Sequence, residues 1–155
     1  MKFITDRSLG RLAKWLRILG YDTTYYVGDA DRTFLKKAHS EGRVALTRKR
    51  ELARRQFTGQ MLMIEADRVE DQLRYVIDHY VLTPDSKNLF SCCLRCNAKL
   101  VPLRKEEAKE LVPVYTYETQ QHFMHCQECG SIFWPGTHKN RAEEFFRMRI
   151  PTGHR

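Results

Sequence analysis

The chain has 155 residues, a formal net charge of +8, 42% hydrophobic residues and 30% charged residues. This is long enough for one ordinary domain, or for a domain with a small satellite, and apolar enough to fold. The longest unbroken apolar run is residues 61–64, far short of the roughly 20 residues that span a bilayer, and the first residues lack a signal peptide's apolar stretch. We therefore expect a cytoplasmic protein without a membrane partner. Its excess of Lys and Arg favours an anionic partner such as nucleic acid.

The first 82 residues alternate between strand-like and helix-like patterns. In chain order we expect a strand at 2–6, a helix carrying Leu9 to Leu19 and closed by Gly20, a strand at 23–27, a helix around 34–38 that ends by Gly42, a strand at 43–47, a short helix at 49–55, a strand at 61–64 and a helix over 69–80. Asp67 and Glu70 have the spacing of a capping box for the last helix. This alternation predicts an α/β fold with a mostly parallel sheet flanked by helices.

The helical and strand periodicity is lost after Leu82. A polar stretch around Pro84 indicates a linker, so we predict one domain over residues 1–84 and a second over 85–155. Residues 90–137 hold all five cysteines, together with Pro102 and Pro113. They have too few apolar residues to form a core without a further link such as a bound metal ion. Residues 140–148 are expected to form a short C-terminal helix.

Four of the five cysteines form two C-x2-C pairs with 29 residues between them: Cys93, Cys96, Cys126 and Cys129. Four thiolates give the closed tetrahedral site of structural zinc, and without an export signal the pattern indicates metal rather than disulfides. Cys92 could replace Cys93, although the spacing of the second pair favours Cys93. His122 and His125 are close enough to compete as ligands, but ordinary surface or strand histidines are the favoured interpretation.

Acidic side chains follow the first two predicted strands. Asp6 comes after the first strand, and Asp29 and Asp31 come after the second. Ligands of open parallel sheets bind outside the carboxyl ends of the strands, and carboxylates gathered there would hold Mg²⁺ or Mn²⁺ and activate water for phosphodiester cleavage. Each also has a local interpretation, as a helix N-cap for Asp29 or Asp31 and as an Asx turn for Asp6. Spacing alone favours the local roles.

Basic residues cluster in two stretches of the first domain: Arg7, Arg11 and Lys14, and then Arg48, Lys49, Arg50, Arg54 and Arg55. Guanidinium groups clamp phosphates, and Trp15 would stack on a base, as single-stranded RNA binding requires. The alternative is a solvated helix face with a partly buried Trp15, which is the better interpretation for that residue alone. For the whole cluster, RNA is the favoured partner.

Residues 6–22 read Asp-Arg-Ser-Leu-Gly-Arg-Leu-Ala-Lys-Trp-Leu-Arg-Ile-Leu-Gly-Tyr-Asp and resemble the opening of the Mut-seven C-terminal ribonuclease domain family. The resemblance extends over the segment with Asp29 and Asp31, residues 46–48, both cysteine pairs and residues 134–136, which is nearly the whole chain. It implies a PIN-like α/β domain followed by a zinc ribbon, with metal-dependent ribonuclease activity. It also implies an acidic pocket containing Asp6 and one or both of Asp29 and Asp31.

One position departs from this resemblance. Where the family usually reads Thr-Arg-Asp-Arg, this chain has Lys49 in place of the acid. Two unit charges about 4 Å apart at an effective dielectric near 20 interact by roughly 4 kcal/mol, enough to weaken a divalent-metal site severely. Glu51 lies two residues on, but on a helix it would point elsewhere. The hypotheses are therefore an RNA-cleaving enzyme, a catalytically impaired RNA-binding module, and an adaptor that binds a protein partner through its zinc ribbon.

Overall fold

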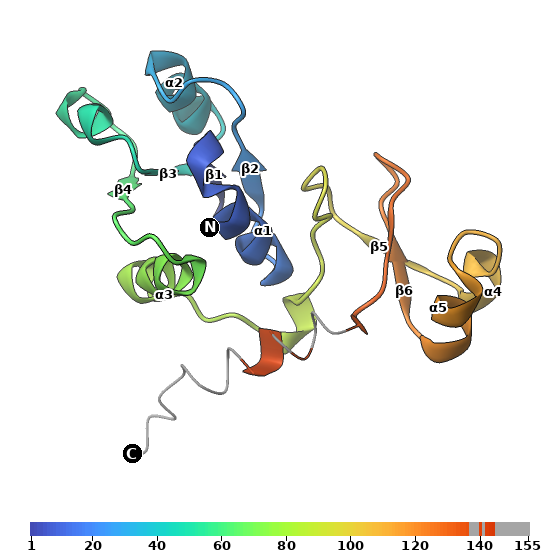
Figure 1. The fold of residues 1–155 in the computed structure, drawn as a ribbon. Helices are drawn as coiled ribbons and strands as arrows, with labels where there is room; N and C mark the ends of the chain where they lie inside the picture. The colour runs from blue at the N-terminus through green and yellow to red at the C-terminus, as the bar shows by residue number, and fades with distance from the viewer. Residues whose placement is uncertain (137–139, 141, 145–155) are drawn as a thin grey trace.

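The structure is a computed structural model that describes residues 1–136, 140 and 142–144. Its elements, shown in Figure 1, are β1 (Phe3–Thr5), η1 (Arg7–Leu9), α1 (Gly10–Ile18), β2 (Thr23–Tyr25), α2 (Arg32–Ser40), β3 (Val44–Thr47), η2 (Arg50–Arg54), β4 (Met61–Met63), α3 (Val69–Tyr80), η3 (Ser86–Asn88), β5 (Val101–Leu103), α4 (Lys105–Ala108), α5 (Val114–Thr119), β6 (Phe123–His125) and β7 (Ile132–Phe133). Within the described part of the chain, no helix has the length and apolar character needed to cross a bilayer.

The first four strands form one parallel sheet in the order β2-β1-β3-β4. This confirms the predicted α/β fold class, whereas the PIN-like assignment stays a prediction. The chain leaves β1 toward one edge of the sheet and returns to β3 on the other side of β1. Such a switch in direction opens a crevice outside the carboxyl ends of the two strands. The end of β1 and the end of β3 are therefore where a ligand site is expected.

Alternating side chains give the sheet two buried faces. Phe3, Val44 and Leu46 point to a core shared with α1 and α3, while Ile4 and Ala45 point to a core shared with α2 and η2. Figure 1 shows α2 on one side of the strands and α3 on the other. Burying each large apolar side chain contributes about 1.5–3 kcal/mol, so helices are needed on both faces, as the sequence pattern predicts.

The predicted capping box at the start of α3 is wrong. The N-cap position is Arg68, and no side chain makes a cap hydrogen bond there. Asp67 instead places its carboxylate 2.7 Å from the Arg48 guanidinium, because a charge-assisted pair competes with a backbone N–H for the same acceptor. The helix that was predicted over residues 69–80 is otherwise present.

The second unit is a three-stranded antiparallel sheet in the order β5-β6-β7. Its hydrophobic cluster is small and is built around the buried residues Cys93, Leu100 and Cys126, in keeping with the expectation that a metal ion holds this unit together. The short helices α4 and α5 connect β5 to β6 and were not predicted. The helix predicted for residues 140–148 lies largely outside the described residues. The proposed boundary at residue 84 stays a prediction.

Hydrogen bonds fasten this ribbon to the amino end of β2, an edge strand. The Asn97 side chain accepts from the Thr23 backbone N–H at 2.8 Å and donates to Asp22 Oδ1 at 2.5 Å. Arg17 donates to the Thr23 carbonyl at 2.8 Å and to the Leu94 carbonyl at 2.9 Å. An exposed edge strand can pair with a strand of another chain. These contacts occupy polar backbone groups of β2 and so protect its edge. The ribbon thus lies at the opposite end of the sheet from the switch-point crevice.

Gly20 allows the linker to lie against the end of α1. Its φ of 90° is in the left-handed region, and a Cβ atom there would lie 2.3 Å from the Asn88 carbonyl oxygen. Phe90, two residues after Asn88, donates its backbone N–H to the Ile18 carbonyl at 2.8 Å. No side chain fits between these backbone segments.

Replacing Gly20 with Ala should therefore destabilise the fold more than the same change at Gly42, whose φ is 62° and whose missing Cβ would meet nothing within 4 Å. Both variants incur about 1–2 kcal/mol for a left-handed alanine, and only Gly20→Ala incurs a further 1–3 kcal/mol or so from the clash. Urea unfolding of the two variants measures the difference. Equal losses would show that the linker does not rest on Gly20.

Candidate nucleic-acid interface and metal centre

The four predicted zinc ligands form one cluster, in which one Sγ atom from each of Cys93, Cys96, Cys126 and Cys129 lies within 4.8 Å of the others. The Cys93–Cys129 and Cys96–Cys126 sulfur pairs are 3.6 Å and 3.4 Å apart. A tetrahedral zinc ion with Zn–S bonds of about 2.3 Å needs sulfurs about 3.8 Å apart, so the cluster fits the ion. Cys92, His122 and His125 do not belong to it.

The two cysteine turns have the same backbone construction. Asn97 and Gly130, each directly after the second cysteine of its pair, have φ values of 70° and 74°. Their N–H groups donate to the carbonyls of Cys93 and Cys126 at 2.9 Å and 2.8 Å. The backbone therefore presents both pairs without help from a large core. Asn is one of the few residues that tolerate this conformation.

Local hydrogen bonding prepares one of the sulfurs for a metal. Sγ of Cys129 lies 3.2 Å from Ser131 Oγ. Hydrogen bonds from the Ser131 side chain and backbone lower the pKa of Cys129 to about 6. The thiolate is the form that binds zinc, so this sulfur is ready for a metal at neutral pH.

The purified protein should hold about one zinc ion per chain, and chelation should open residues 90–136 first, since metal binding supplies folding free energy to such small units. Cys96→Ser should lose the metal. Cys92→Ser is the matched control, because Cys92 is buried next to the cluster but outside it. Elemental analysis and hydrogen exchange measure both effects. Protein purified without chelator that holds no zinc would contradict this prediction.

A pocket of about 320 Å³ lies at the switch point of the sheet, and Asp6, Arg7, Ser8, Asp29, Ala30, Arg48 and Lys49 line it. These residues come from the segments that follow β1, β2 and β3. Three of the side chains are cations and two are carboxylates. The lining therefore carries a net positive charge at neutral pH, which suits an anion better than a divalent cation.

Asp6 is the one buried charged side chain among these lining residues, with 4% exposure. Its Oδ1 accepts from the N–H and hydroxyl of Ser8 at 2.8 Å and 2.5 Å, and its Oδ2 accepts from the Thr47 hydroxyl at 2.7 Å and the Arg48 N–H at 2.9 Å. A carboxylate has about four acceptor positions, so all are used. Burial raises the pKa of Asp6, but these hydrogen bonds outweigh it and the net pKa lies below its usual value.

The other two predicted acids make different contacts. Asp29 is 73% exposed in its side chain and lies 3.6 Å from the Arg7 guanidinium. Asp31 accepts from the Thr33 N–H at 2.8 Å and caps α2, and it does not line the pocket. Among the described residues, the four cysteines are the one group with ligand atoms close enough to share a metal. As arranged, Asp6, Asp29 and Asp31 do not fit a divalent cation, and their catalytic role stays a prediction.

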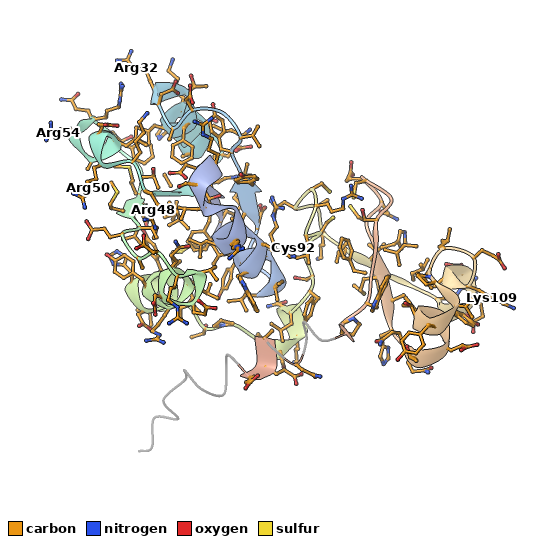
Figure 2. The ribbon with its side chains drawn as sticks, viewed as in Figure 1. Arg32, Arg48, Arg50, Arg54, Cys92 and Lys109 are labelled. Carbon is orange, nitrogen blue, oxygen red and sulfur yellow. The ribbon has the colours of Figure 1, made fainter. Side chains whose placement is uncertain are left out.

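The predicted RNA-binding residues divide between the pocket and the surface around it. Arg7, Arg48 and Lys49 line the pocket, and the Arg48 guanidinium is held by the Asp67 carboxylate and the Ala66 carbonyl. Arg50, Arg54 and Arg55 are exposed on or next to η2, and Arg11 and Lys14 are exposed on α1. Figure 2 shows Arg32, Arg48, Arg50 and Arg54 on the same side of the first unit, far from Lys109. Trp15 packs partly buried against the core under α1.

The family comparison decides the assignment that the sequence resemblance implied. The profile of the Mut7-C RNAse domain matches residues 1–146. The chain belongs to this family. No curated protein and no solved structure matched the chain. The Mut7-C match covers both the parallel-sheet unit and the ribbon. In this member of the family, Lys49 lines the switch-point pocket.

Several residues that shape the two units were missed in the sequence. Arg17 is only 7% exposed, and its place on the apolar stripe of α1 was the available signal for a buried hydrogen-bonding role. Asn97 occupies the position that Gly130 has in the second pair, which signalled a special turn. The basic residues Arg32 and Lys36 share one helix face at a spacing of four, a pattern that went unused.

Asp6→Asn should lower the free energy of unfolding by about 1–3 kcal/mol, because an amide N–H₂ must face buried donors that the carboxylate accepted from. Asp31→Asn is the control and should be nearly neutral, since Asn caps helices as well as Asp does. The lowered pKa of Asp6 means that its stabilisation is present above about pH 4, the unfolded value, and is lost as the pH falls through the folded value.

Denaturant unfolding at a series of pH values checks both parts. Wild type should lose stability below about pH 4 more steeply than Asp6→Asn does. Equal pH dependence of the two proteins would contradict the hydrogen-bond network as the cause.

Proposed function

We propose that this member of the Mut7-C RNAse domain family binds single-stranded RNA, with one backbone phosphate in the switch-point pocket. The observation that carries the proposal is the surplus of Arg7, Arg48 and Lys49 over the two carboxylates in that pocket. A net charge of +8 gives long-range attraction in the same sense. The family's description as an RNase domain supports RNA as the anion.

Arg48, Arg7 and Lys49 differ in how firmly other residues hold their side chains, and this difference decides how each would contact a phosphate. Arg48 is held by Asp67 and the Ala66 carbonyl, so it offers a fixed guanidinium edge. Arg7 pairs with Asp29 on the surface, where both side chains are more than two-thirds exposed. Such exposed pairs contribute only about 0–1 kcal/mol, so a phosphate displaces Asp29 from Arg7 at little cost. Lys49 is exposed and supplies a mobile point charge.

The basic surface around the pocket extends the binding site. Arg50, Arg54 and Arg55 continue from the pocket along η2, and Arg11 and Lys14 lie on α1. Each phosphate that these residues neutralise adds to the salt dependence of binding. No base sequence follows from such contacts, because phosphates are common to all sequences.

A second candidate function is metal-dependent cleavage of that RNA, with Asp6, Asp29 and Asp31 holding Mg²⁺ or Mn²⁺. Membership of a ribonuclease-domain family and the shared pocket of Asp6 and Asp29 favour it. Lys49 and the fully used acceptors of Asp6 oppose it. We propose that cleavage by the natural chain is weak or absent, and that Lys49 is the main cause.

Binding of labelled single-stranded RNA in buffer without added Mg²⁺ or Mn²⁺, and without a chelator that would remove zinc from the ribbon, should weaken severalfold in Lys49→Ala. The slope of log affinity against log salt should become shallower by about 0.7 for the lost phosphate contact. Lys109→Ala is the matched control, since Lys109 is exposed on the ribbon far from the pocket (Figure 2) and removes the same charge. Equal effects of the two substitutions would show that only net charge matters. Wild type without affinity for RNA would overturn the proposed function.

Lys49→Asp changes the pocket charge by two units and should tighten Mn²⁺ binding at least tenfold, about 1.4 kcal/mol, with cleavage of single-stranded RNA rising in parallel. Adding Asp29→Asn to Lys49→Asp should reverse the gain, and because Asp29 is exposed this control avoids the folding loss expected for Asp6→Asn. Calorimetry with Mn²⁺ and a cleavage assay measure the effects. Wild type that already cleaves RNA fully, without a gain in Lys49→Asp, would contradict the inhibitory role of Lys49.

A further inference from the structure

A cavity of about 650 Å³, larger than the switch-point pocket, lies between α2 and the segment that follows η2. Its lining residues are Arg32, Leu35, Lys36, His39, Arg55, Gln56, Phe57 and Thr58. Two arginines, a lysine and a histidine are among them, and no carboxylate is. The volume is in the range of small-molecule sites in proteins, about 300–1,000 Å³.

The three cations Arg32, Lys36 and Arg55 of this cavity have no acidic partner among its lining residues. Within the described part of the chain, no carboxylate lies within ion-pair distance of Arg32, Lys36 or Arg55. Lys37, the next residue along α2, pairs with Glu41 at 3.4 Å instead. Like charges facing one cavity repel each other, so an anion bound between them is stabilised.

An aromatic ring is held in the wall beside these charges. Phe57 lines the cavity, is half-buried and packs against the core under α2. A Cβ atom at Gly59 would lie 2.5 Å from the Phe57 ring, so glycine at that position lets the ring lie against the backbone. His39 Nδ1 is 3.5 Å from Thr58 Oγ1, which bridges the two walls. A planar ring next to unpaired cations is the combination on which nucleic-acid bases stack while phosphates bind.

The cavity and the switch-point pocket are lined by neighbouring parts of the same two chain segments. Ala30 lines the pocket and Arg32 lines the cavity, and two residues span at most about 7 Å. On the other wall, Lys49 and Arg55 stand at the two ends of η2. A single RNA strand in an extended conformation can therefore pass from the switch-point pocket to the cavity along these two segments.

We propose that this cavity binds a nucleotide of the RNA strand whose neighbouring phosphate occupies the switch-point pocket. Arg32, Lys36 and Arg55 hold a phosphate, and the base stacks on Phe57. The inference rests on the proposed RNA binding and assigns it a second contact site. It predicts that bases, and not only phosphates, contribute to affinity.

The test compares three probes on the full chain: oligouridine, inorganic polyphosphate, which has no bases, and polyglutamate, an acidic peptide. Lys36→Gln should weaken oligouridine and polyphosphate binding severalfold and make the salt slope shallower by about 0.7. Lys37→Gln is the matched control, because it removes the same charge from the adjacent position of α2 but not from the cavity. Phe57→Leu should weaken oligouridine binding about tenfold, through lost stacking, and leave polyphosphate binding unchanged.

The outcomes separate this inference from the proposed function. Wild type that does not bind oligouridine overturns both. Oligouridine binding that depends on Lys49 but is unchanged in Lys36→Gln and Phe57→Leu overturns this inference and leaves the proposed function standing. If Lys36→Gln weakens only the binding of polyglutamate, the occupant of the cavity is an acidic protein, and this result also overturns the inference. Two controls separate lost stacking from a packing defect. Thermal unfolding of Phe57→Leu measures whether the substitution destabilises the fold. Phe57→Tyr keeps an aromatic ring and should keep its affinity for oligouridine.

Discussion

The carboxylate of Asp6 is the contact on which the switch-point pocket depends. It receives two hydrogen bonds from Ser8, in η1, and one each from Thr47 and Arg48, at the end of β3. Two loops that are forty residues apart in sequence are thereby fixed to one buried charge. The same saturation that makes Asp6 a good structural anchor makes it a poor ligand for a metal, because each added bond to a cation would break an existing one.

The charges around that anchor are distributed in a way that favours an anion. Some cations of the first unit have an acidic partner, such as Arg43 with Asp22 at 2.7 Å. Around the two cavities the surplus is positive, and in the cavity beside α2 no acid is present. The proposed association with RNA would then be driven by phosphate contacts and counterion release.

The ribbon and the switch-point pocket lie at opposite ends of the parallel sheet. Asn97, in the first cysteine turn, covers the amino end of β2 through its hydrogen bonds to Thr23 and Asp22. Zinc binding would fix that turn, so a metal held by four thiolates stabilises an edge strand of the neighbouring unit. The carboxyl ends of β1 and β3 stay accessible because the ribbon is at the other end. This arrangement separates the four cysteines that could hold a stabilising metal from the surface that would bind RNA.

Much of the architecture was predictable from local patterns. Helical spacing of leucines, alternation of apolar residues and the two cysteine pairs specified the α/β sheet, its helices and the metal cluster, because each depends on periodicity or on neighbours a few residues apart. Asp31 illustrates the limit, since its spacing allowed both a metal ligand and a helix cap, and the structure shows the cap. The four donors to Asp6, the Arg48–Asp67 pair that replaced the expected capping box, and the cavity between α2 and Phe57 join segments far apart in sequence. Only the packed tertiary structure decides such contacts, because a buried acceptor takes whichever donors the fold brings within about 3 Å.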